Sequence, residues 1–416
     1  MRIKLAAPQL LLGLLLSVHA TAEPLPTAAP ESVGLSAERL DRITEFLRND
    51  VANGTIPGAV LLISRQGKIA YFEAVGHLDP QASSKMGKDA IFRIYSMTKP
   101  IVTVAAMMLV EQGKLALGEP VAKHLPEFDD VKVGVEKRDA DGKVTLDLVP
   151  PARPMTIQDL MRHTSSLAYD FSAVGAVKKA YLEANLYTGD PDNAEFAARL
   201  AKLPLAHQPG TTWEYSHATD VLGRVIEVVT GKPLSQALRE MLLDPLGMAD
   251  TSFYVTDPAR QKRLAEPFAN DRKVGDPRVV RRREGGGGGL VGTAEDYARF
   301  LQMLANGGTL DGRRYLGPST VAYMTSDHMG DVIRRGPSDV LGPGYRFGLG
   351  FAVRTDAGMA SIAGSAGDYY WAGAAGTYFW VDPKEKMFVV FMVQTPGNRG
   401  RYWTLLRNIV YAAITE

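Results

Sequence analysis

Strand-like segments gather at the two ends of this 416-residue chain, and helical segments fill its middle. Two short apolar runs near the N-terminus, 59–64 and 68–74, are joined by a tight turn and have the composition of strands. Three similar runs, 348–354, 377–382 and 387–394, lie in the last third of the chain. The most economical fold pairs these two sets of strands in one antiparallel sheet.

Apolar residues that recur with a period near 3.6 predict helices between and beyond these strands. The expected helices follow Ser36, span 101–110, end at Gly231, span 294–304 and span 402–414. Ser36 is a typical N-cap, and Thr156 with Asp159 has the pattern of a capping box that opens a further helix. Alternating residues in 131–148, around Asp141-Gly142, predict a small hairpin.

These patterns predict an α+β fold in which one domain, residues 23–416, has two parts. An α/β part of about 31–98 and 340–416 holds the sheet with the first and last helices packed on it. A mostly helical part, about 99–339, lies beside it. A cleft between two such parts is the expected place for a small-molecule site. Within the helical part, Arg281-Arg282-Arg283-Glu284 is expected to form a solvated loop, with a mobile rim of the cleft as the alternative.

Residues 1–22 have the layout of a secretory signal. Arg2 and Lys4 precede an apolar run at 10–18, and Ala20-Thr21-Ala22 supplies small residues for cleavage. The apolar run is shorter than the roughly 20 residues that span a bilayer, so a retained membrane anchor is the lesser alternative. We therefore expect an exported protein, periplasmic or secreted, with a mature chain that begins near Glu23.

Composition excludes several function classes. Removing Arg2 and Lys4 leaves 45 of the 47 basic residues against 46 acidic ones, a net charge of −1 that gives no electrostatic reason to bind nucleic acid. The chain has no cysteine, which excludes disulfides, thiolate catalysis and cysteine-ligated zinc. It also lacks the His-Glu-x-x-His and P-loop patterns, so we expect neither a metal site nor nucleotide chemistry. The oligomeric state is not set by any pattern in the chain.

Ser96 and Lys99 are the first candidate catalytic pair. They stand three residues apart at the predicted start of a helix, where Pro100 fits the first turn, so both project from the same face. A serine hydroxyl needs a nearby base to become a nucleophile, and a lysine with a lowered pKa can serve. One Ser-x-x-Lys is expected by chance in a chain of this size. The alternative is that Ser96 only caps the helix and Lys99 is a surface charge.

Tyr215, in the segment Trp213-Glu214-Tyr215-Ser216-His217, is the second candidate. A lysine ammonium beside a tyrosine can lower the phenol pKa from about 10, so that the tyrosine works as a base near neutrality. The alternative is a half-buried core tyrosine.

The third candidate is Trp371-Ala372-Gly373-Ala374, just before the predicted strand at 377–382. Small residues let the backbone approach a substrate, and the backbone N–H of Ala374 can join that of Ser96 in an oxyanion hole. The alternative is an ordinary glycine-rich entry to a strand.

Together and in this order, the three elements resemble the active-site motifs of the penicillin-recognising serine hydrolases, which include β-lactamases, D,D-peptidases and related esterases. The chain is most similar to the family VIII carboxylesterases, which share the fold of class C β-lactamases. Further segments that match familiar parts of this superfamily are Arg162-His163-Thr164-Ser165-Ser166-Leu167, Pro209-Gly210-Thr211, Pro245-Leu246-Gly247-Met248, Gly287-Gly288-Gly289-Leu290 and Gly376-Thr377-Tyr378-Phe379-Trp380.

The resemblance implies a serine carboxylesterase that acts on small-molecule esters, with short acyl chains expected. Ser96 forms the acyl-enzyme, Lys99 assists proton transfer, and Tyr215 acts first as base and then as acid toward the leaving alcohol. No cofactor is implied.

Three departures from the superfamily pattern bear on the substrate. Trp371 stands where β-lactamases have the lysine of Lys-Thr-Gly, which weakens the case for penicillin-like substrates and suits an apolar group. His217 takes the place of the asparagine in Tyr-x-Asn, where it can hydrogen-bond the substrate but titrates near pH 6.5 when unperturbed. Ser166 replaces a glycine, which we interpret as a loop detail.

The sequence leaves three other functions to compare with an esterase. A conventional Ser-His-Asp hydrolase is poorly supported, because Ala363 stands where the first glycine of a Gly-x-Ser-x-Gly nucleophile elbow is needed, before Gly364-Ser365-Ala366-Gly367. A β-lactamase or D,D-peptidase is the alternative within the superfamily. A non-catalytic binding protein of the same fold is the alternative from another class, and the joint presence of Ser96, Lys99 and Tyr215 argues against it.

Overall fold

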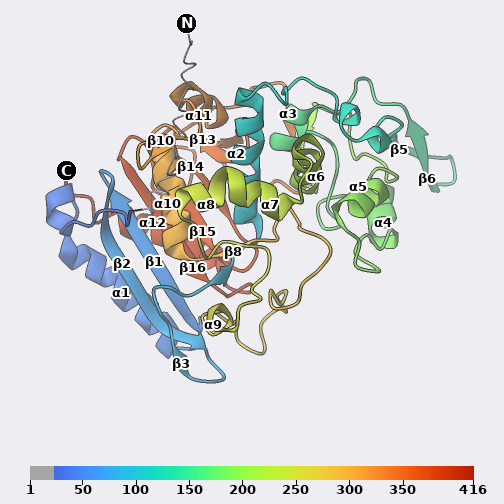
Figure 1. The fold of residues 1–416 in the computed structure, drawn as a ribbon. Coiled ribbons are helices and arrows are strands. Elements are labelled where there is room, and N and C mark those ends of the chain that lie inside the picture. The colour runs from blue at the N-terminus through green and yellow to red at the C-terminus, as the bar shows by residue number, and fades with distance from the viewer. Residues whose placement is uncertain (1–22) are drawn as a thin grey trace, which may run out of the picture.

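A computed structural model describes residues 23–416, so the predicted secretory signal at 1–22 lies outside the described residues. An eight-stranded antiparallel sheet forms the centre of the molecule (Figure 1). Its strands, in spatial order, are β12 (Tyr345–Phe347), β13 (Ala352–Arg354), β14 (Tyr369–Ala372), β15 (Tyr378–Asp382), β16 (Met387–Val393), β1 (Gly58–Arg65), β2 (Lys68–Asp79) and β3 (Ser84–Lys85).

The two ends of the chain meet inside this sheet, as the sequence predicts. Strand β1 pairs with β16 in antiparallel register, from Ala59 opposite Val393 to Arg65 opposite Met387. The predicted strand at 348–354 is wrong in its first half, because Gly350 adopts φ 86° in a turn that separates β12 from β13. Strand β14, beside the glycine-rich stretch, was not predicted.

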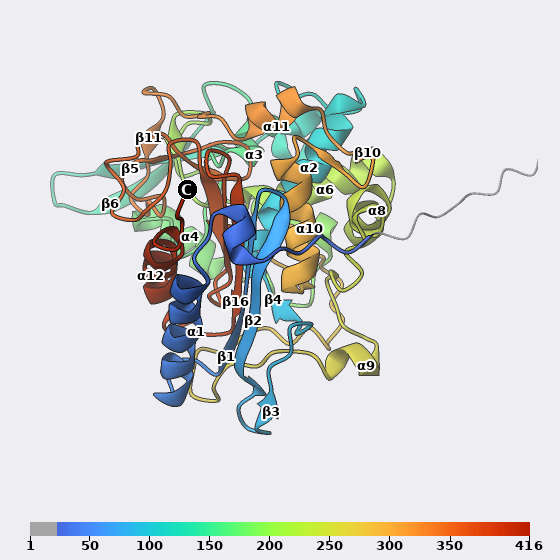
Figure 2. The same ribbon diagram turned by 90° about the vertical axis from the view of Figure 1, so that its left-hand side faces the viewer.

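Both faces of the sheet are buried, and alternate residues of each central strand face opposite cores. Leu61 and Phe391 belong to a core under helices α1 (Ala37–Ala52) and α12 (Arg399–Tyr411). Val60 and Val390 belong to the larger core, which includes α2 (Thr98–Glu111) and α10 (Ala294–Ala305). Figure 2 shows α1 and α12 on one side of the sheet and α10 on the other.

The larger core continues into the helical region beyond the sheet. Helix α2 is buried along nearly its whole length and packs against α6 (Ala218–Thr230), which ends at Gly231 in the left-handed conformation, φ 68°. Thr156 and Asp159 form the predicted capping box of α3 (Ile157–Met161). The other helices are α4 (Gly175–Glu183), α5 (Asn193–Leu200), α7 (Leu234–Leu238), α8 (Asp244–Leu246), α9 (Pro258–Gln261) and α11 (Pro318–Met324).

The predicted hairpin is confirmed as β5 (Val133–Arg138) and β6 (Val144–Val149), which project from the helical region (Figure 1). Short two-residue strands complete the fold: β4 (Phe92–Arg93), β7 (Thr212–Trp213), β8 (Val291–Gly292), β9 (Thr309–Leu310), β10 (Arg313–Arg314) and β11 (Arg334–Arg335). Helix α10 lies within the range 99–339 that was assigned to the helical part, yet it packs on β1 and β16. None of the described helices is long and apolar enough to cross a bilayer.

Candidate active site

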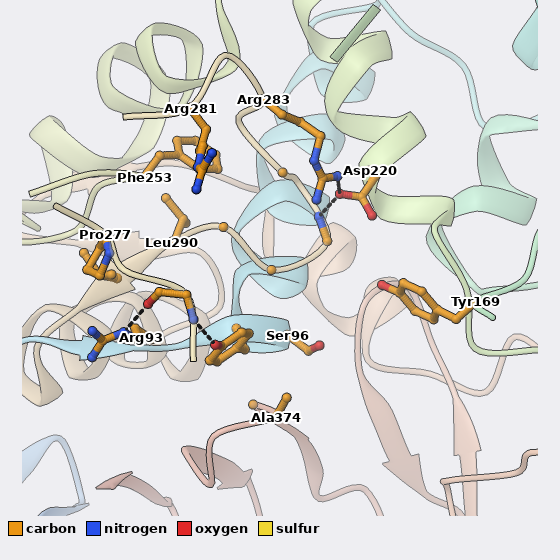
Figure 3. Close-up of a pocket in the computed structure, with 18 of the residues that line it drawn as sticks. Arg93, Ser96, Tyr169, Asp220, Phe253, Pro277, Arg281, Arg283, Leu290 and Ala374 are labelled. Atoms are coloured by element: carbon orange, nitrogen blue, oxygen red, sulfur yellow. Dashed lines mark hydrogen bonds and ion pairs between the residues drawn. The ribbon is translucent and has the colours of Figure 1, made fainter. Parts of the chain in front are cut away.

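Ser96 lies in a single 3-10 turn, Tyr95–Met97, that leads directly into α2. Tyr95 has φ 44°, a left-handed conformation that costs a non-glycine residue about 1–2 kcal/mol. Tertiary contacts hold this turn in place: the Tyr95 hydroxyl accepts a hydrogen bond from the backbone N–H of Gly275 at 3.0 Å, and the Tyr297 hydroxyl donates to the Met97 carbonyl at 3.0 Å. The fold therefore fixes the position of Ser96 on the wall of a cavity (Figure 3).

The structure brings Ser96, Lys99 and Tyr215 together. The Tyr215 hydroxyl donates to Ser96 Oγ at 2.6 Å, and Lys99 Nζ donates to the same oxygen at 3.3 Å. Lys99 Nζ also lies 4.6 Å from the centre of the Tyr215 ring, close enough for a cation–π interaction. A hydroxyl, an amine and a phenol thus share one small volume, which is an arrangement suited to moving a proton from the serine to a leaving group.

Packing fixes the direction of Tyr215, which lies between β7 and α6. Its ring centre is 5.3 Å from that of Trp371 and 5.0 Å from that of His163. His163 is fully buried, and burial lowers its pKa well below the ordinary value, an effect that the nearby Lys99 ammonium strengthens. His163 is therefore neutral at physiological pH and serves as an uncharged wall for the phenol.

Lys99 is buried, and two further acceptors hold its ammonium group. It donates to the Gly287 carbonyl at 2.6 Å and to the Tyr169 hydroxyl at 3.1 Å. Sequence reasoning missed Tyr169, although it follows a superfamily-like segment at 162–167 by only two residues. Burial raises the pKa of Tyr169 well above 10, and this phenol therefore remains protonated at neutral pH. It accepts a hydrogen bond from Lys99 without gaining charge.

Asp220 organises the glycine run beside the site and was also missed. Its Oδ1 accepts hydrogen bonds from the Gly287 backbone N–H and from Arg283 Nη1, both at 3.0 Å, and its Oδ2 lies 3.0 Å from His217 Nδ1. Burial alone would raise the pKa of Asp220, but the Arg283 guanidinium and the His217 hydrogen bond hold it well below its usual range. A charged carboxylate therefore positions Gly287, whose carbonyl in turn accepts from Lys99.

His217 does not occupy the place expected of it. Its side chain is 3% exposed, makes an edge contact with Tyr169 at 4.1 Å between ring centres, and is absent from the lining of the cavity. Burial lowers its pKa below 6.5, and its hydrogen bond to Asp220 offsets this only in part. His217 therefore supports Asp220 and does not line the cavity where its contact with substrate was predicted.

Trp371, Gly373 and Ala374 all line the cavity. Trp371 belongs to β14 and is nearly buried against Tyr215 and Phe347. A Cβ atom on Gly373 would overlap Thr377 Oγ1 and the Ile94 carbonyl, so only glycine lets this strand approach the segment that bears Ser96. Among the described residues, none accepts a hydrogen bond from the Ala374 backbone N–H. Its role in an oxyanion hole stays a prediction.

The cavity measures about 980 Å³ and extends well beyond these motifs. Its wall includes Arg281 and Arg283, from the segment predicted to be a solvated loop. For Arg283 that prediction is wrong: its guanidinium turns inward, pairs with Asp220 and lies 4.3 Å from the ring centre of Phe196. In the part of the chain that the structure describes, no cluster of three or more His, Asp or Glu side chains is arranged to hold a metal ion.

Comparison with known proteins places this fold and site in a class. The beta-lactamase family model matches residues 43–412. Protein Rv1367c of Mycobacterium tuberculosis is 39% identical over 371 residues, which cover 85% of this chain and 90% of that protein. Esterase EstB of Burkholderia gladioli is 33% identical over 424 residues, which cover 93% and 98%. The structure of EstCE1, described as a hydrolase with promiscuous acyltransferase activity, matches with a TM-score of 0.73 at 29% identity and covers 90% of this chain and 98% of that one.

An antiparallel sheet built from both chain ends, with helices on both faces, is thus the β-lactamase/transpeptidase-like fold. The chain belongs to the beta-lactamase family. The predicted likeness to the penicillin-recognising serine hydrolases and their family VIII esterases is confirmed, and the protein is a serine hydrolase of this fold with esterases among its relatives.

Proposed function

We propose that the protein is a carboxylesterase that works through an acyl-enzyme on Ser96. One observation supports this most directly: Ser96 Oγ, on the wall of the cavity, lies within hydrogen-bonding distance of both the Tyr215 hydroxyl and Lys99 Nζ. A serine between a base and a cation is the arrangement that acyl transfer requires.

In the proposed acylation step, Ser96 Oγ attacks the ester carbonyl while deprotonated Tyr215 takes the serine proton. The Lys99 ammonium stabilises the negative charge of the phenolate, and backbone N–H groups of Ser96 and Ala374 bind the oxyanion. The bond from the carbonyl carbon to the alkoxy oxygen then breaks, and Tyr215 returns its proton to the leaving alcohol. In deacylation a water molecule attacks the acyl carbon and gives a proton to Tyr215. The bond from that carbon to Ser96 Oγ then breaks, Tyr215 returns the proton to Ser96 Oγ, and the acid is released.

Two features support an ester rather than a β-lactam as substrate. Trp371 contributes an apolar indole where the β-lactamase pattern has a cation, so a carboxylate next to the reacting carbonyl has no lysine to meet there. In addition, a relative that is 33% identical over nearly its full length is itself an esterase by name.

Turnover of a short-chain p-nitrophenyl ester and of a chromogenic cephalosporin by the same preparation tests this proposal. We expect the ester to be hydrolysed far faster, and intact-mass analysis to find an acyl adduct on the peptide that contains Ser96. Ser96→Ala should abolish both signals without loss of thermal stability. Faster cephalosporin turnover would indicate a β-lactamase, and absence of any adduct would indicate a binding protein.

Tyr215→Phe tests the proton transfer separately. The phenyl ring keeps the contacts with Trp371 and His163 but removes the hydroxyl that reaches Ser96. We expect kcat to fall by at least about 100-fold, because general acid–base groups typically contribute a factor of 10² to 10⁴, while KM and melting temperature change little. Retention of a wild-type kcat would remove Tyr215 from the mechanism.

We also propose that the protein is exported, on the pattern of residues 1–22 described above. Expression of the full chain in a bacterium, followed by fractionation and N-terminal sequencing, should give a periplasmic or secreted product that begins near Glu23. A cytoplasmic product that keeps Met1 would contradict this.

A further inference from the structure

The cavity is larger and more apolar than a short-chain ester requires. Its volume of about 980 Å³ lies at the upper end of the 300–1,000 Å³ typical of pockets for drug-sized ligands. Aromatic side chains line much of its wall: Tyr169, Phe171, Tyr187, Phe253, Tyr254 and Trp371. Phe171, Tyr187 and Val340 line the cavity although 59%, 58% and 52% of their surfaces are exposed. Large apolar residues left open at the mouth indicate that the substrate has a bulky apolar body.

The carboxylates in the cavity wall all have basic or backbone partners. Asp220 pairs with Arg283 at 3.0 Å, and Asp276 pairs with Arg278 at 3.0 Å. Asp190 Oδ2 accepts the backbone N–H of Arg282 at 3.3 Å. Asp220 and Asp276 are therefore paired with arginines, and Asp190 is engaged by a backbone donor.

The four arginines that line the cavity differ in the partners of their guanidinium groups. Arg93 pairs with Glu266 at 2.9 Å, and Arg283 is held by Asp220. Arg399 donates to the backbone carbonyls of Pro396 and Ala374 at 2.8 and 3.4 Å. Like Arg399, Arg281 has no carboxylate oxygen of the described residues within 4.0 Å of its guanidinium. Unlike Arg399, its exposed side chain, which lines the cavity, donates no hydrogen bond to the described residues, so all its donors are free for a ligand.

The loop on which Arg281 stands is anchored on its C-terminal side. Arg282 pairs with Asp192 at 2.7 Å and with Glu195 at 2.8 Å, next to the start of α5. Arg283 is fixed by Asp220, as described above. Figure 3 shows the Arg281 side chain extending from this loop beside Phe253 toward Leu290, on the opposite side of the cavity from Tyr169. The guanidinium is thus presented at the apolar wall without being neutralised there.

The geometry points to an anionic amphiphilic ester as the substrate class: an ester whose bulky apolar body carries a carboxylate remote from the reacting carbonyl, bound by Arg281. A guanidinium is the side chain best suited to a carboxylate, because two parallel N–H donors meet its two oxygens. This inference rests on the proposed esterase function for its catalytic consequence. The predicted binding of the carboxylate by Arg281 depends only on the cavity and not on that function.

Matched pairs of esters test this inference. One pair is the mono-p-nitrophenyl ester of a long-chain dicarboxylic acid and the same compound with the free acid capped as a methyl ester. A second pair places the carboxylate, free or capped, on the alcohol half of an acetate ester. We expect the free acid of at least one pair to show a kcat/KM about tenfold above its capped partner, with the difference decreasing at high salt. Arg281→Gln should remove this preference while the kcat/KM of the capped esters stays within about twofold.

Arg282→Gln is the matched control, since it removes a neighbouring guanidinium that pairs outside the cavity, and it should leave the preference unchanged. Calorimetric titration of the same esters into the Ser96→Ala variant measures binding without turnover. If the proposed function fails, no ester is turned over, but the Arg281-dependent difference in Kd remains. Equal Kd values for free and capped esters in both pairs, unaffected by Arg281→Gln, would overturn the inference.

Discussion

Lys99 is held by acceptors that come from separate parts of the chain: Ser96 in its own helix entrance, Tyr169 after α3, and Gly287 in the glycine run. The last of these depends on Asp220, whose carboxylate binds the Gly287 N–H. A Cβ atom on Gly287 would lie 2.6 Å from Asp220 Oδ2, so this close approach requires glycine. The position of the ammonium beside Ser96 is therefore set in part by a carboxylate that does not touch it.

Asp220→Asn tests this indirect role. The amide removes the charge that pairs with Arg283 and one of the acceptors at Oδ1 and Oδ2, so Gly287 and Lys99 lose their fixed positions. We expect kcat, expressed per serine titrated with a covalent probe, to fall by roughly 10–100-fold, as for loss of an outer-shell partner. The unpaired buried arginine should also lower the melting temperature.

Asp276→Asn is the matched control, because Asp276 lines the same cavity and pairs with Arg278 but has no link to the glycine run. Its kcat should remain near the wild-type value. A kcat for Asp220→Asn as high as that of this control would show that Lys99 needs no such support.

His217 makes the stability of the protein depend on pH in a direction that can be predicted. Its pKa is lower in the folded protein than its unfolded value of about 6.5, chiefly because it is buried. Below that pH the unfolded chain binds a proton that the native state refuses, so stability is full above about pH 6.5 and is lost as the pH falls. His217→Asn should therefore lessen the fall in melting temperature between pH 7.5 and 5.5, whereas replacing the exposed His77 should not. Identical slopes for both variants would contradict the assignment.

The grouping of Ser96, Lys99 and Tyr215 was predictable because its signals are local: a serine three residues before a lysine at a helix entrance, and a tyrosine in a recognisable five-residue segment. Asp220, Tyr169 and Arg283 had no such signal, since each acquires its role from contacts with segments more than 60 residues away. His217 was predicted to face the cavity and does not, for a related reason. Its spacing from Tyr215 predicts that the two residues lie close together, but not which way the His217 side chain points.

At the scale of elements, the strands with the clearest patterns were predicted well. In β1 and β16 apolar residues run continuously, which fits strands buried on both faces. Strand β14 escaped because its four residues precede a glycine-rich turn that dominates the local composition. The prediction of a strand over 348–351 is wrong because apolar residues alternate with glycines in this turn, and Gly350 adopts a positive φ that the sequence pattern does not reveal.

The first turn of α10 contains a buried carboxylate, Asp296, whose surroundings disfavour its charged form. Asp296 is buried, and burial together with the neighbouring Asp250 raises its pKa to about 6, although Thr251 donates to it at 2.8 Å. Between about pH 4 and 6 the native state binds a proton that the unfolded chain has lost, so stability decreases as the pH rises through this window. The cost at neutral pH is on the order of 3 kcal/mol for a shift of about two pKa units.

Asp296→Asn should therefore stabilise the protein. The amide oxygen can still accept from Thr251 and from the Asp250 N–H, so the expected gain in unfolding free energy at pH 7.5 is about 1–3 kcal/mol, with none at pH 4. Denaturant unfolding at both pH values measures it. Glu295→Gln, at an exposed position in the same turn, should give no gain at either pH; equal behaviour of the two variants would contradict the assignment.

At the scale of the whole molecule, α12 covers one face of a sheet whose strands come from both ends of the chain. Tyr402, Leu406 and Val410 are fully buried against it, and Arg407 pairs with Asp368 at 2.8 Å. Because β1 and β16 are more than 300 residues apart, this pairing forms only after most of the chain is available. The amino-terminal and carboxyl-terminal segments are thus one structural unit, however distant in sequence.

Leu406→Ala measures how much the packing of α12 contributes to the unfolding free energy. Loss of a fully buried leucine should lower the unfolding free energy by about 2–5 kcal/mol, while kcat per titrated serine stays unchanged because Leu406 lies in the core and does not line the cavity. Thr404→Ala, on the exposed side of the same helix, should cost much less. If the two variants have equal stability, the helix does not contribute the packing described.

Leu35 and Ile414 lie in one antiparallel bridge, so the chain that enters α1 and the chain that leaves α12 lie side by side. A circular permutant can therefore join the two old ends through a linker and open new ends at Gly142, in the exposed turn of the β5–β6 hairpin. In such a permutant β16, α12, α1 and β1 follow one another in sequence, which turns the longest-range pairing of the sheet into a local one and should speed refolding.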